Sequence, residues 1–335
     1  MVDRPRVLAG ILYSGEPTLS RAIDALEAQQ DIDLRIVLFG GFDQWEAHRR
    51  LYRTFNETGN DVDMFVKVDA DMVILHERLL AVLHAFLSDH EQLDRITVGV
   101  HDWLADAPIP GMHVWRSSVR WLEDPPALQT DLARNTVRAK LSYIDSPERL
   151  VLHAPDPTDV QAARYAARRT LKATARPNSR WEWARLEGLL SRALEDPQPA
   201  RRIAAAAIRI TFDHPDRMQR FVMEQGQVEE IISWIRRSSA DWPNVADEAL
   251  EHVRECARKA EENNELQAPN MSQPANMSRL GRFGLLLRGP FRAFSQRRGA
   301  DVTRSLPSEQ ELAAMLTTML DFGERSQDSP NCGRD

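Results

Sequence analysis

The chain is expected to fold as an α/β protein with a mainly α-helical C-terminal extension. Three short apolar segments alternate with amphipathic segments of helical spacing before residue 75, at 7–13, 34–39 and 64–68. Strand–helix alternation of this kind favours a Rossmann-like, mostly parallel sheet. After residue 158 the helical period continues without strands to about residue 262, which is typical of a separate helical module.

The first elements follow from simple patterns. Residues 7–13 are almost continuously apolar, as expected of a strand covered on both faces. The turn residues at 14–17 end this strand, and Thr18 or Ser20 opens a helix over 19–30. A second strand at 34–39 ends in two glycines.

The third strand leads into a pair of carboxylates. A helix over 45–55 precedes it, and the strand at 64–68 runs into Asp69-Ala70-Asp71 and then into the apolar residues 72–74. Residues two apart in an extended segment point to the same side, so the Asp69 and Asp71 side chains should converge. Close carboxylates repel each other unless a cation lies between them, and hard divalent ions prefer oxygen ligands. The pattern therefore predicts a metal site, with a polar turn as the alternative.

The ends of these strands should lie together. In parallel α/β sheets, ligands bind at the carboxyl ends of the strands. Tyr13, the glycine pair Gly40-Gly41, and both Asp69 and Asp71 fall at such ends. This edge is the expected binding site.

The order of elements resembles the GT-A nucleotide-sugar glycosyltransferases, particularly the bacterial family-2-like enzymes. The matching pieces are the strand ending at Tyr13, the helix with Arg21-Ala22-Ile23-Asp24-Ala25-Leu26, and the run from Lys67 to Val73. The resemblance covers about residues 5–155 and implies a GT-A-like domain over 1–157. The chain departs from that family at Phe39-Gly40-Gly41-Phe42-Asp43, where an acidic pair with a Gly-Ser turn is usual.

The resemblance implies the donor and metal ligands. A nucleotide-diphosphate sugar would be held by Tyr13, Ser14, Glu16, Asp43, Lys67 and Asp69. Asp69 and Asp71 would bind Mn²⁺ or Mg²⁺, because oxygen ligands suit these ions. His153, which follows the expected strand at 149–152, would be a further ligand; a purely structural role is the alternative.

An inverting transfer also needs a general base, usually a carboxylate. Asp131 is the first candidate, because the family places an acidic residue at the start of a helix here, and Thr130 stands where a further acid is common. Asp124 or Glu123 in the preceding loop is the second. Asp131 would otherwise only favour the positive end of its helix.

The acceptor is expected beside the strand at 96–100 and a Pro/Gly loop at 107–111. His113, Trp115 and Arg116 follow that loop and suit a sugar ring, whose C–H groups stack on aromatic faces while its hydroxyls form hydrogen bonds. Trp103 and Trp121 lie in the same part of the chain, and some of these tryptophans are expected to belong to the core.

Composition narrows the classes of function. The 335 residues carry a net charge of −7, with a pI of about 5.8, which argues against nucleic-acid binding. The two cysteines, Cys256 and Cys332, lie far apart, so neither a disulfide framework nor a zinc site is expected and a reducing cytoplasm is the natural location. The sequence shows no signal peptide and no apolar run of membrane-spanning length, so a chain that does not span the membrane is expected.

The C-terminal half divides into four predicted parts. A helical domain spans 158–262 and a flexible linker spans 263–278. A basic amphipathic segment and a terminal helix occupy 279–322, and a disordered tail follows at 323–335. Arginines interleaved with leucine and phenylalanine at 279–298 predict peripheral contact with the inner, anionic face of a membrane; packing on the helical domain is the alternative.

The resulting hypothesis is a metal-dependent glycosyltransferase that moves a sugar from a nucleotide-diphosphate donor to a glycan or glycolipid acceptor, with inversion. A nucleotidyltransferase is the second hypothesis, but Ser14-Gly15-Glu16 lacks the basic residue that this class places after its first strand. A non-catalytic scaffold with a degenerate transferase domain is the third.

Overall fold

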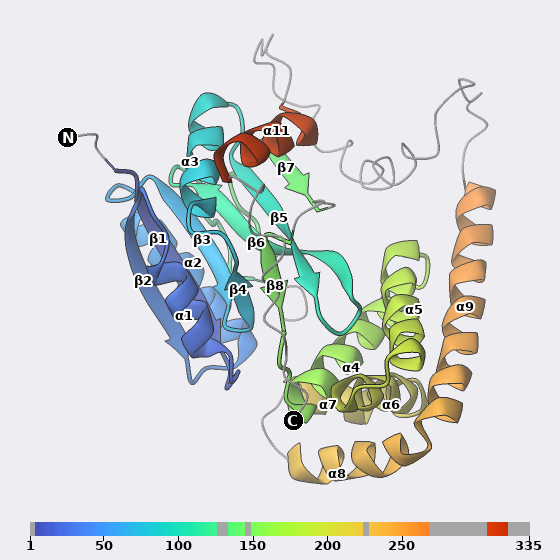
Figure 1. The fold of residues 1–335 in the computed structure, drawn as a ribbon. Helices are drawn as coiled ribbons and strands as arrows, with labels where there is room; N and C mark the ends of the chain where they lie inside the picture. The colour runs from blue at the N-terminus through green and yellow to red at the C-terminus, as the bar shows by residue number, and fades with distance from the viewer. Residues whose placement is uncertain (1–3, 126–132, 145–148, 224–227, 268–306, 321–335) are drawn as a thin grey trace.

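The computed structural model describes residues 4–125, 133–144, 149–223, 228–267 and 307–320, and confirms the α/β class (Figure 1). The strands are β1 Arg6–Tyr13, β2 Asp33–Gly40, β3 Met64–Asp69, β4 Met72–Ile74, β5 Arg95–Asp102, β6 Ala107–Arg116, β7 Lys140–Tyr143 and β8 Val151–His153. The helices of the sheet domain are α1 Leu19–Glu27, α2 Gln44–Thr58 and α3 Leu79–Asp89. The later helices are α4 Asp159–Ala175, α5 Arg180–Glu195, α6 Pro199–Asp213, α7 Pro215–Met223, α8 Val228–Ser238, α9 Trp242–Gln267 and α11 Glu309–Leu320.

The eight strands form one mixed sheet. Their order is β2-β1-β3-β6-β5-β8-β4, and β7 pairs with β5. The pairs β1–β2, β1–β3, β5–β7 and β5–β8 are parallel, whereas β3–β6, β5–β6 and β4–β8 are antiparallel. The expectation of a mostly parallel sheet therefore holds only for part of it. Only four residues separate β5 from β6, and so short a connection allows only an antiparallel return.

The expected Pro/Gly loop at 107–111 is a strand. These residues form the first half of β6 and pair with β5, with Pro108 opposite His101 and Pro110 opposite Gly99. On its other edge, β6 pairs with β3 only from His113 onward. The prolines thus lie where one edge of the strand has no partner in β3, and there the missing N–H groups cost no ladder hydrogen bond.

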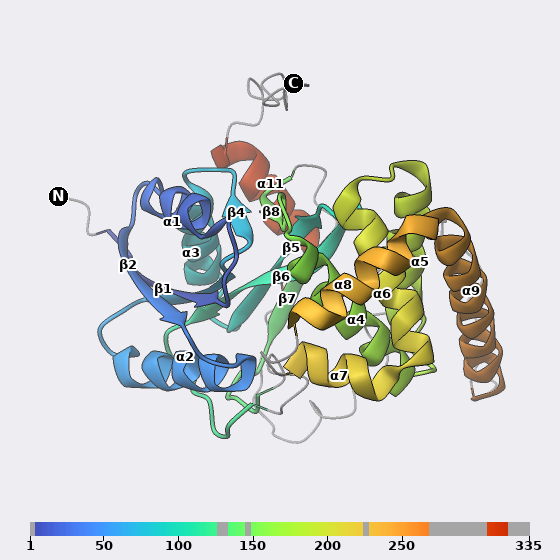
Figure 2. The same ribbon diagram turned by 90° about the horizontal axis from the view of Figure 1, so that it is seen from below.

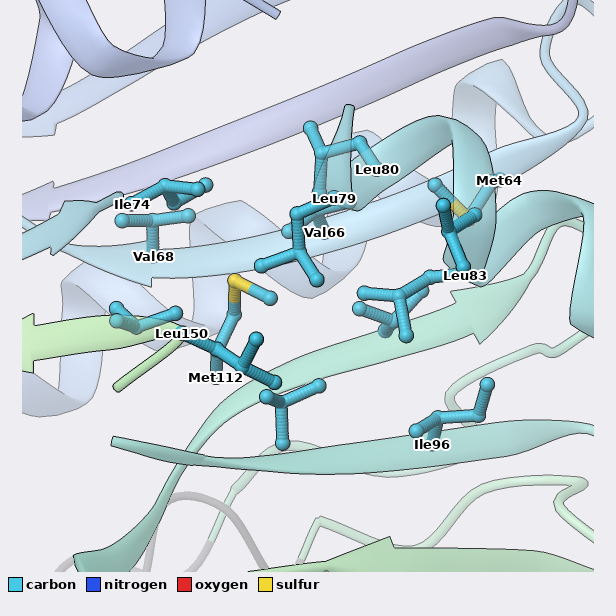
Figure 3. Packing of buried hydrophobic residues seen from close by; sticks show 14 of the residues in the cluster. Met64, Val66, Val68, Ile74, Leu79, Leu80, Leu83, Ile96, Met112 and Leu150 are labelled. Atoms are coloured by element: carbon cyan, nitrogen blue, oxygen red, sulfur yellow. The ribbon is translucent and has the colours of Figure 1, made fainter. Parts of the chain in front are cut away.

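Helices cover both faces of the sheet. One core contains the side chains between the sheet and α1, α3 and α11, including Val66, Leu83 and Met112 (Figure 3). The other lies under α2, on the opposite side of the sheet (Figure 2), where Phe55 stacks on Phe65 at a centroid distance of 4.5 Å. This packing fixes the strand ends that carry the polar side chains.

Helices α4 to α9 form a second body beside the sheet (Figure 1). Its core is rich in alanine: α4 buries Ala162, Ala163, Ala166, Ala167 and Ala173, and α6 buries Ala200 and Ala204 to Ala207. Small side chains let the two helix backbones approach closely, so α4 is held rigidly against α6.

The hairpin between β5 and β6 joins the two bodies. Leu104 at its tip is buried in the core of the helical body. Arg201 of α6, with a side chain only 4% exposed, donates to the carbonyl oxygen of Trp103 at 2.7 Å and lies over the Trp103 ring. Asp106 forms an ion pair of 3.3 Å with Arg192 of α5. These contacts fix the helical body against the end of the sheet.

The C-terminal part differs from the expected division in one respect. Helix α9 continues to Gln267, past the expected start of the linker at 263. The rest of the linker, the arginine-rich segment 279–298 and the tail 323–335 lie outside the described residues. Helix α11 buries Leu312 and Leu316 against the core that α3 also covers. In the part of the chain that the structure describes, no helix is long and apolar enough to span a membrane.

Gly99 provides a test of the packing of the sheet. A Cβ atom there would lie 2.2 Å from the backbone oxygen of Ile144, at the irregularity where the β5–β6 register shifts. Gly99→Ala should therefore lower the free energy of unfolding by about 1–3 kcal/mol, the usual cost of overpacking. Denaturation by urea measures this loss.

The matched control is Gly188→Ala in α5, where a Cβ would meet no atom within 4 Å. The free energy of unfolding of this variant should rise by about 0.5–1 kcal/mol, because alanine is the better helix former. Equal stability of the two variants would contradict the close contact at Gly99.

Candidate active site

A cavity of about 680 Å³ lies between the end of the sheet and the helical body, a size within the range of small-molecule sites. The sheet contributes the ends of β1 and β3 and the middle of β6, and the helical body contributes α4. Of the residues predicted for the site, nine line this cavity: Tyr13, Ser14, Glu16, Asp43, Lys67, Asp69, Asp71, His113 and His153.

The two predicted metal-binding aspartates lie at a tight turn between β3 and β4. The Ala70 N–H donates to the carbonyl oxygen of Leu12 in β1, and the Ala70 carbonyl oxygen accepts from the Thr18 hydroxyl at 3.0 Å. The Asp71 carbonyl oxygen accepts from the Ala154 N–H at 2.8 Å. Three neighbouring segments thus fix the backbone of the turn, and both carboxylates are held at the cavity wall.

Asp71 is held in an environment that does not suit an anion. Its Oδ1 atom is buried without a hydrogen-bond partner. Burial, together with the nearby charges of Asp69 and Glu16, raises the pKa of the carboxyl to about 6 against the opposing effect of His153. A cation beside Oδ1 would give this oxygen a partner and would offset the repulsion between the neighbouring carboxylates.

His153 connects this carboxylate to a second one. Its Nε2 lies 3.7 Å from Asp71 Oδ2, and its Nδ1 lies 2.7 Å from Asp102 Oδ2. The Asp102 side chain is fully buried and also accepts the Ala105 N–H at 2.7 Å. Burial lowers the pKa of His153, but Asp71 and then Asp102 outweigh it and raise the pKa to about 9.

This arrangement orients the imidazole. A carboxylate only accepts, so the Asp102 contact places a proton on Nδ1 of His153. Nε2 is then directed toward Asp71 and the cavity. A histidine whose other nitrogen is fixed by a carboxylate is the usual form of a metal-binding imidazole.

The residues fit a divalent ion in one defined way. Among the described residues, no group of three or more His, Cys, Asp or Glu side chains that could hold a metal ion is found. Mg²⁺ and similar ions are commonly bound by one or two carboxylates, with water and phosphate oxygens completing the shell. The unsatisfied Oδ1 of Asp71, with Asp69 and the oriented His153 beside it, suits that mode.

The loops after β1 and β2 form another part of the wall. Gly15 and Gly41 have φ angles of +112° and +78°, which favour glycine, and they turn the chain sharply where each strand ends. Ser14 donates its N–H to Glu16 at 2.6 Å and its hydroxyl to the same carboxylate. Asp43 lines the cavity but also caps α2 by accepting the Glu46 N–H, so part of its hydrogen-bonding capacity is used within the fold.

Helix α4 supplies the opposite, basic wall. Arg164, Arg168, Arg169 and Lys172 all line the cavity, as does Tyr165. The Tyr165 ring lies 5.5 Å from the His153 ring, and the guanidinium of Arg169 lies over Tyr165. On the sheet side, Lys67 is buried and lies 3.4 Å from Asp69. The cavity thus holds carboxylates on one side and a row of cations on the other.

Two residues predicted for the acceptor site do not line the cavity. Trp115 is buried in the core under α2, where its ring lies 5.3 Å from that of Trp121. Arg116 donates to the carbonyl oxygens of Leu87, His90 and Leu93 around the end of α3. Both side chains serve the fold, so of the three predicted acceptor residues only His113 reaches the cavity. Trp103 packs on the helical body instead.

The candidate bases that the structure describes do not line the cavity. Asp131 and Thr130 lie outside the described residues. Asp124 is exposed and does not line the cavity, and neither does Glu123, which pairs with Arg134 at 2.7 Å. Pro125, which follows Asp124, is tied to the cavity wall, because Trp45 donates its ring N–H to the carbonyl oxygen of Pro125 at 2.7 Å.

The predicted site residues did not include Asp102 or the basic residues of α4. Asp102 ends a buried strand, as Asp69 does. This shared position was the signal in the sequence that could have identified Asp102 as part of the site. The basic residues of α4 recur every three or four positions, which places them on one face of a helix. Nothing in the sequence alone shows that this face meets the end of the sheet.

Comparisons with known proteins give no family. No protein-family model matches the chain, and no curated protein matches it. Solved structures do match, and two of them are examples of a weak likeness. A mannosyltransferase from Pyrobaculum calidifontis, in complex with GDP-Man and Mn²⁺, is 14% identical over 96% of this chain and 89% of its own, with a TM-score of 0.34. The STIV protein A197 is 23% identical over 29% of this chain, with a TM-score of 0.23, and the match spans only 47% of its length. At these values neither likeness assigns the chain to a family.

The paired carboxylates around His153 predict its titration. In metal-free protein the pKa of His153 should be about 9, above its ordinary value of 6.5. The charged imidazole should therefore stabilise the fold fully below pH 6.5, and this stabilisation should be lost as the pH rises through 9. NMR titration in the presence of a chelator measures this pKa, with His153→Gln to assign the signal.

His84 is the internal comparison, because burial lowers its pKa. The two histidines should titrate on opposite sides of pH 6.5. A His153 transition at or below pH 6.5 would show that Asp71 and Asp102 do not flank the ring as described.

Proposed function

We propose that the protein is a metal-dependent glycosyltransferase that moves a sugar from a nucleotide-diphosphate donor to a glycan or glycolipid acceptor. The observation that carries this proposal is the buried, unpartnered Oδ1 of Asp71 on the wall of a cavity that also contains Asp69 and His153. A carboxylate oxygen held in this way favours a divalent ion, and an anionic diphosphate is a fitting second ligand of such an ion.

The residues at this site would have different roles in binding the ion and the donor. Asp69 and Asp71 would hold Mn²⁺ or Mg²⁺, and Asp102 would keep His153 oriented toward it. When bound, the ion would neutralise the charge that develops on the leaving diphosphate. Tyr13, Ser14 and Glu16 would contact the donor at the end of β1.

Lys67 and Asp43 complete the proposed donor site. Lys67 is buried beside Asp69, so its ammonium adds positive charge near the proposed position of the diphosphate. Asp43 begins α2 at the wall formed by the loop after β2, where Phe42 and Trp45 supply apolar surface for the nucleoside. The acceptor would enter between His113 and α4.

An inverting reaction requires a base near the acceptor hydroxyl. We retain Asp131 and Asp124 as the candidates, because the Trp45–Pro125 hydrogen bond ties the start of their segment to the cavity wall. The base would take the proton of the acceptor hydroxyl as its oxygen bonds to the sugar carbon and the diphosphate leaves.

Binding of the donor tests the proposal. Thermal shifts should be measured with nucleoside diphosphates, with and without Mn²⁺, because a ligand that binds only the folded state raises the melting temperature. The best nucleotide should stabilise the wild type only together with Mn²⁺. Asp71→Ala and Asp69→Ala should abolish this joint shift.

Asp61→Ala is the matched control, since Asp61 is an exposed aspartate outside the cavity and should leave the shift unchanged. A full Mn²⁺-dependent shift in Asp71→Ala would refute the metal assignment. The absence of any nucleotide shift in the wild type would favour the scaffold hypothesis.

Turnover tests the base. Asp131→Asn cannot accept a proton, so the rate should fall by about 100-fold or more with unchanged donor affinity. Asp124→Asn serves as the alternative variant in the same assay. If Asp131→Asn retains its rate and Asp124→Asn loses it, the base lies in the preceding loop; normal rates in both variants would rule out both candidates.

A further inference from the structure

Helix α4 presents two distinct faces. Five of its alanines and Thr170 are buried in the helical body, whereas Gln161, Arg164, Tyr165, Arg168 and Lys172 line the cavity. Close packing against α6 fixes the first face, so the second is held in place across from Asp69 and Asp71. The basic residues therefore belong to a cavity wall whose position is fixed by packing.

The face of α4 that lines the cavity is positively charged. Arg164, Arg168 and Lys172 stand four residues apart on one face, where like charges repel and destabilise a helix. Asp159 is the only acidic residue of α4, and it pairs with Arg236 of α8 at 2.7 Å. These basic side chains line the cavity, so this wall attracts an anionic ligand.

The row extends beyond the proposed metal site. Tyr165 marks the metal end, because its ring lies beside His153. At a rise of 1.5 Å per residue, Arg168 and Lys172 stand about 5 Å and about 10 Å further along α4. A diphosphate bound at Asp69 and Asp71 occupies the near end and leaves the far end for a second anion.

We propose that Arg168 and Lys172 bind a phosphate group carried by the acceptor. This inference rests on the proposed function, since it assigns the near end of the cavity to the donor. The guanidinium of Arg168 can donate hydrogen bonds to two phosphate oxygens at once, and the ammonium of Lys172, on its flexible side chain, can donate to another. The substrate class is accordingly a phosphorylated acceptor, either a soluble phosphate ester or a lipid phosphate.

The test uses the double variant Arg168→Gln, Lys172→Gln in the full chain, with Arg176→Gln as the matched control. Arg176 lies one turn beyond Lys172 but is exposed and outside the cavity. Calorimetry should measure glycerol 3-phosphate against glycerol, in protein saturated with Mn²⁺ and the nucleoside diphosphate that binds best. Vesicles containing phosphatidic acid, compared with pure phosphatidylcholine, form the lipid arm.

The wild type and Arg176→Gln should bind one of the two phosphate probes and neither neutral counterpart. The double variant should bind that probe about 10-fold more weakly or worse, with nucleotide–Mn²⁺ affinity unchanged. Added salt should weaken the wild-type interaction, as expected for charge attraction. Preference for one probe identifies the soluble or the lipid source.

Three results would overturn the proposal. If neither phosphate probe binds better than its neutral counterpart, the site does not exist. If the double variant loses nucleotide–Mn²⁺ affinity instead, the row holds the donor. If it binds every probe like the wild type, the residues are only a solvated face. The same phosphate titration in metal-free protein separates this inference from the proposed function, which fails when no nucleotide binds.

Discussion

The site is organised around the problem of holding several carboxylates close together away from water. Asp71 has one oxygen buried without a partner, and Asp102 is buried completely on the other side of His153. Burial is the main cause of the raised pKa of Asp71, and the two carboxylates raise the pKa of the imidazole between them. Such an arrangement persists because the surrounding strands and turns fix it, and it favours a cation in the cavity.

Those surroundings come from distant parts of the chain. The aspartate turn is fixed by β1, by the start of α1 and by the residue after β8, whereas Asp102 is held at the base of the hairpin that docks on the helical body. The contact of Arg201 with Trp103 therefore bears on the site, although both residues lie outside the cavity. Sheet, hairpin and α4 together set the distance between the acidic and basic walls.

Much of this could be predicted from local sequence. The apolar runs predicted β1, β2 and β3, and helical spacing predicted α4 to α9, because these patterns reflect burial of one or both faces. The strand at 107–111 was missed since two prolines normally break a ladder. The positions of Trp115 and Arg116 could not be foreseen, because pairing of β6 with β3 and packing under α2 decide which side of the sheet each side chain meets. Tyr165 and the α4 row depend on the docking of two bodies, which no local pattern encodes.

The central claim is that Asp71 and Asp69 hold a divalent ion together with the donor diphosphate. A crystal structure of the chain with Mn²⁺ and a nucleoside diphosphate, with an anomalous difference map recorded at the manganese edge, tests it most directly. The account predicts one manganese peak at about 2 Å from an oxygen of Asp71, next to Asp69 and His153 and bridged to phosphate oxygens. A nucleotide bound elsewhere, or a manganese peak away from this turn, would contradict it.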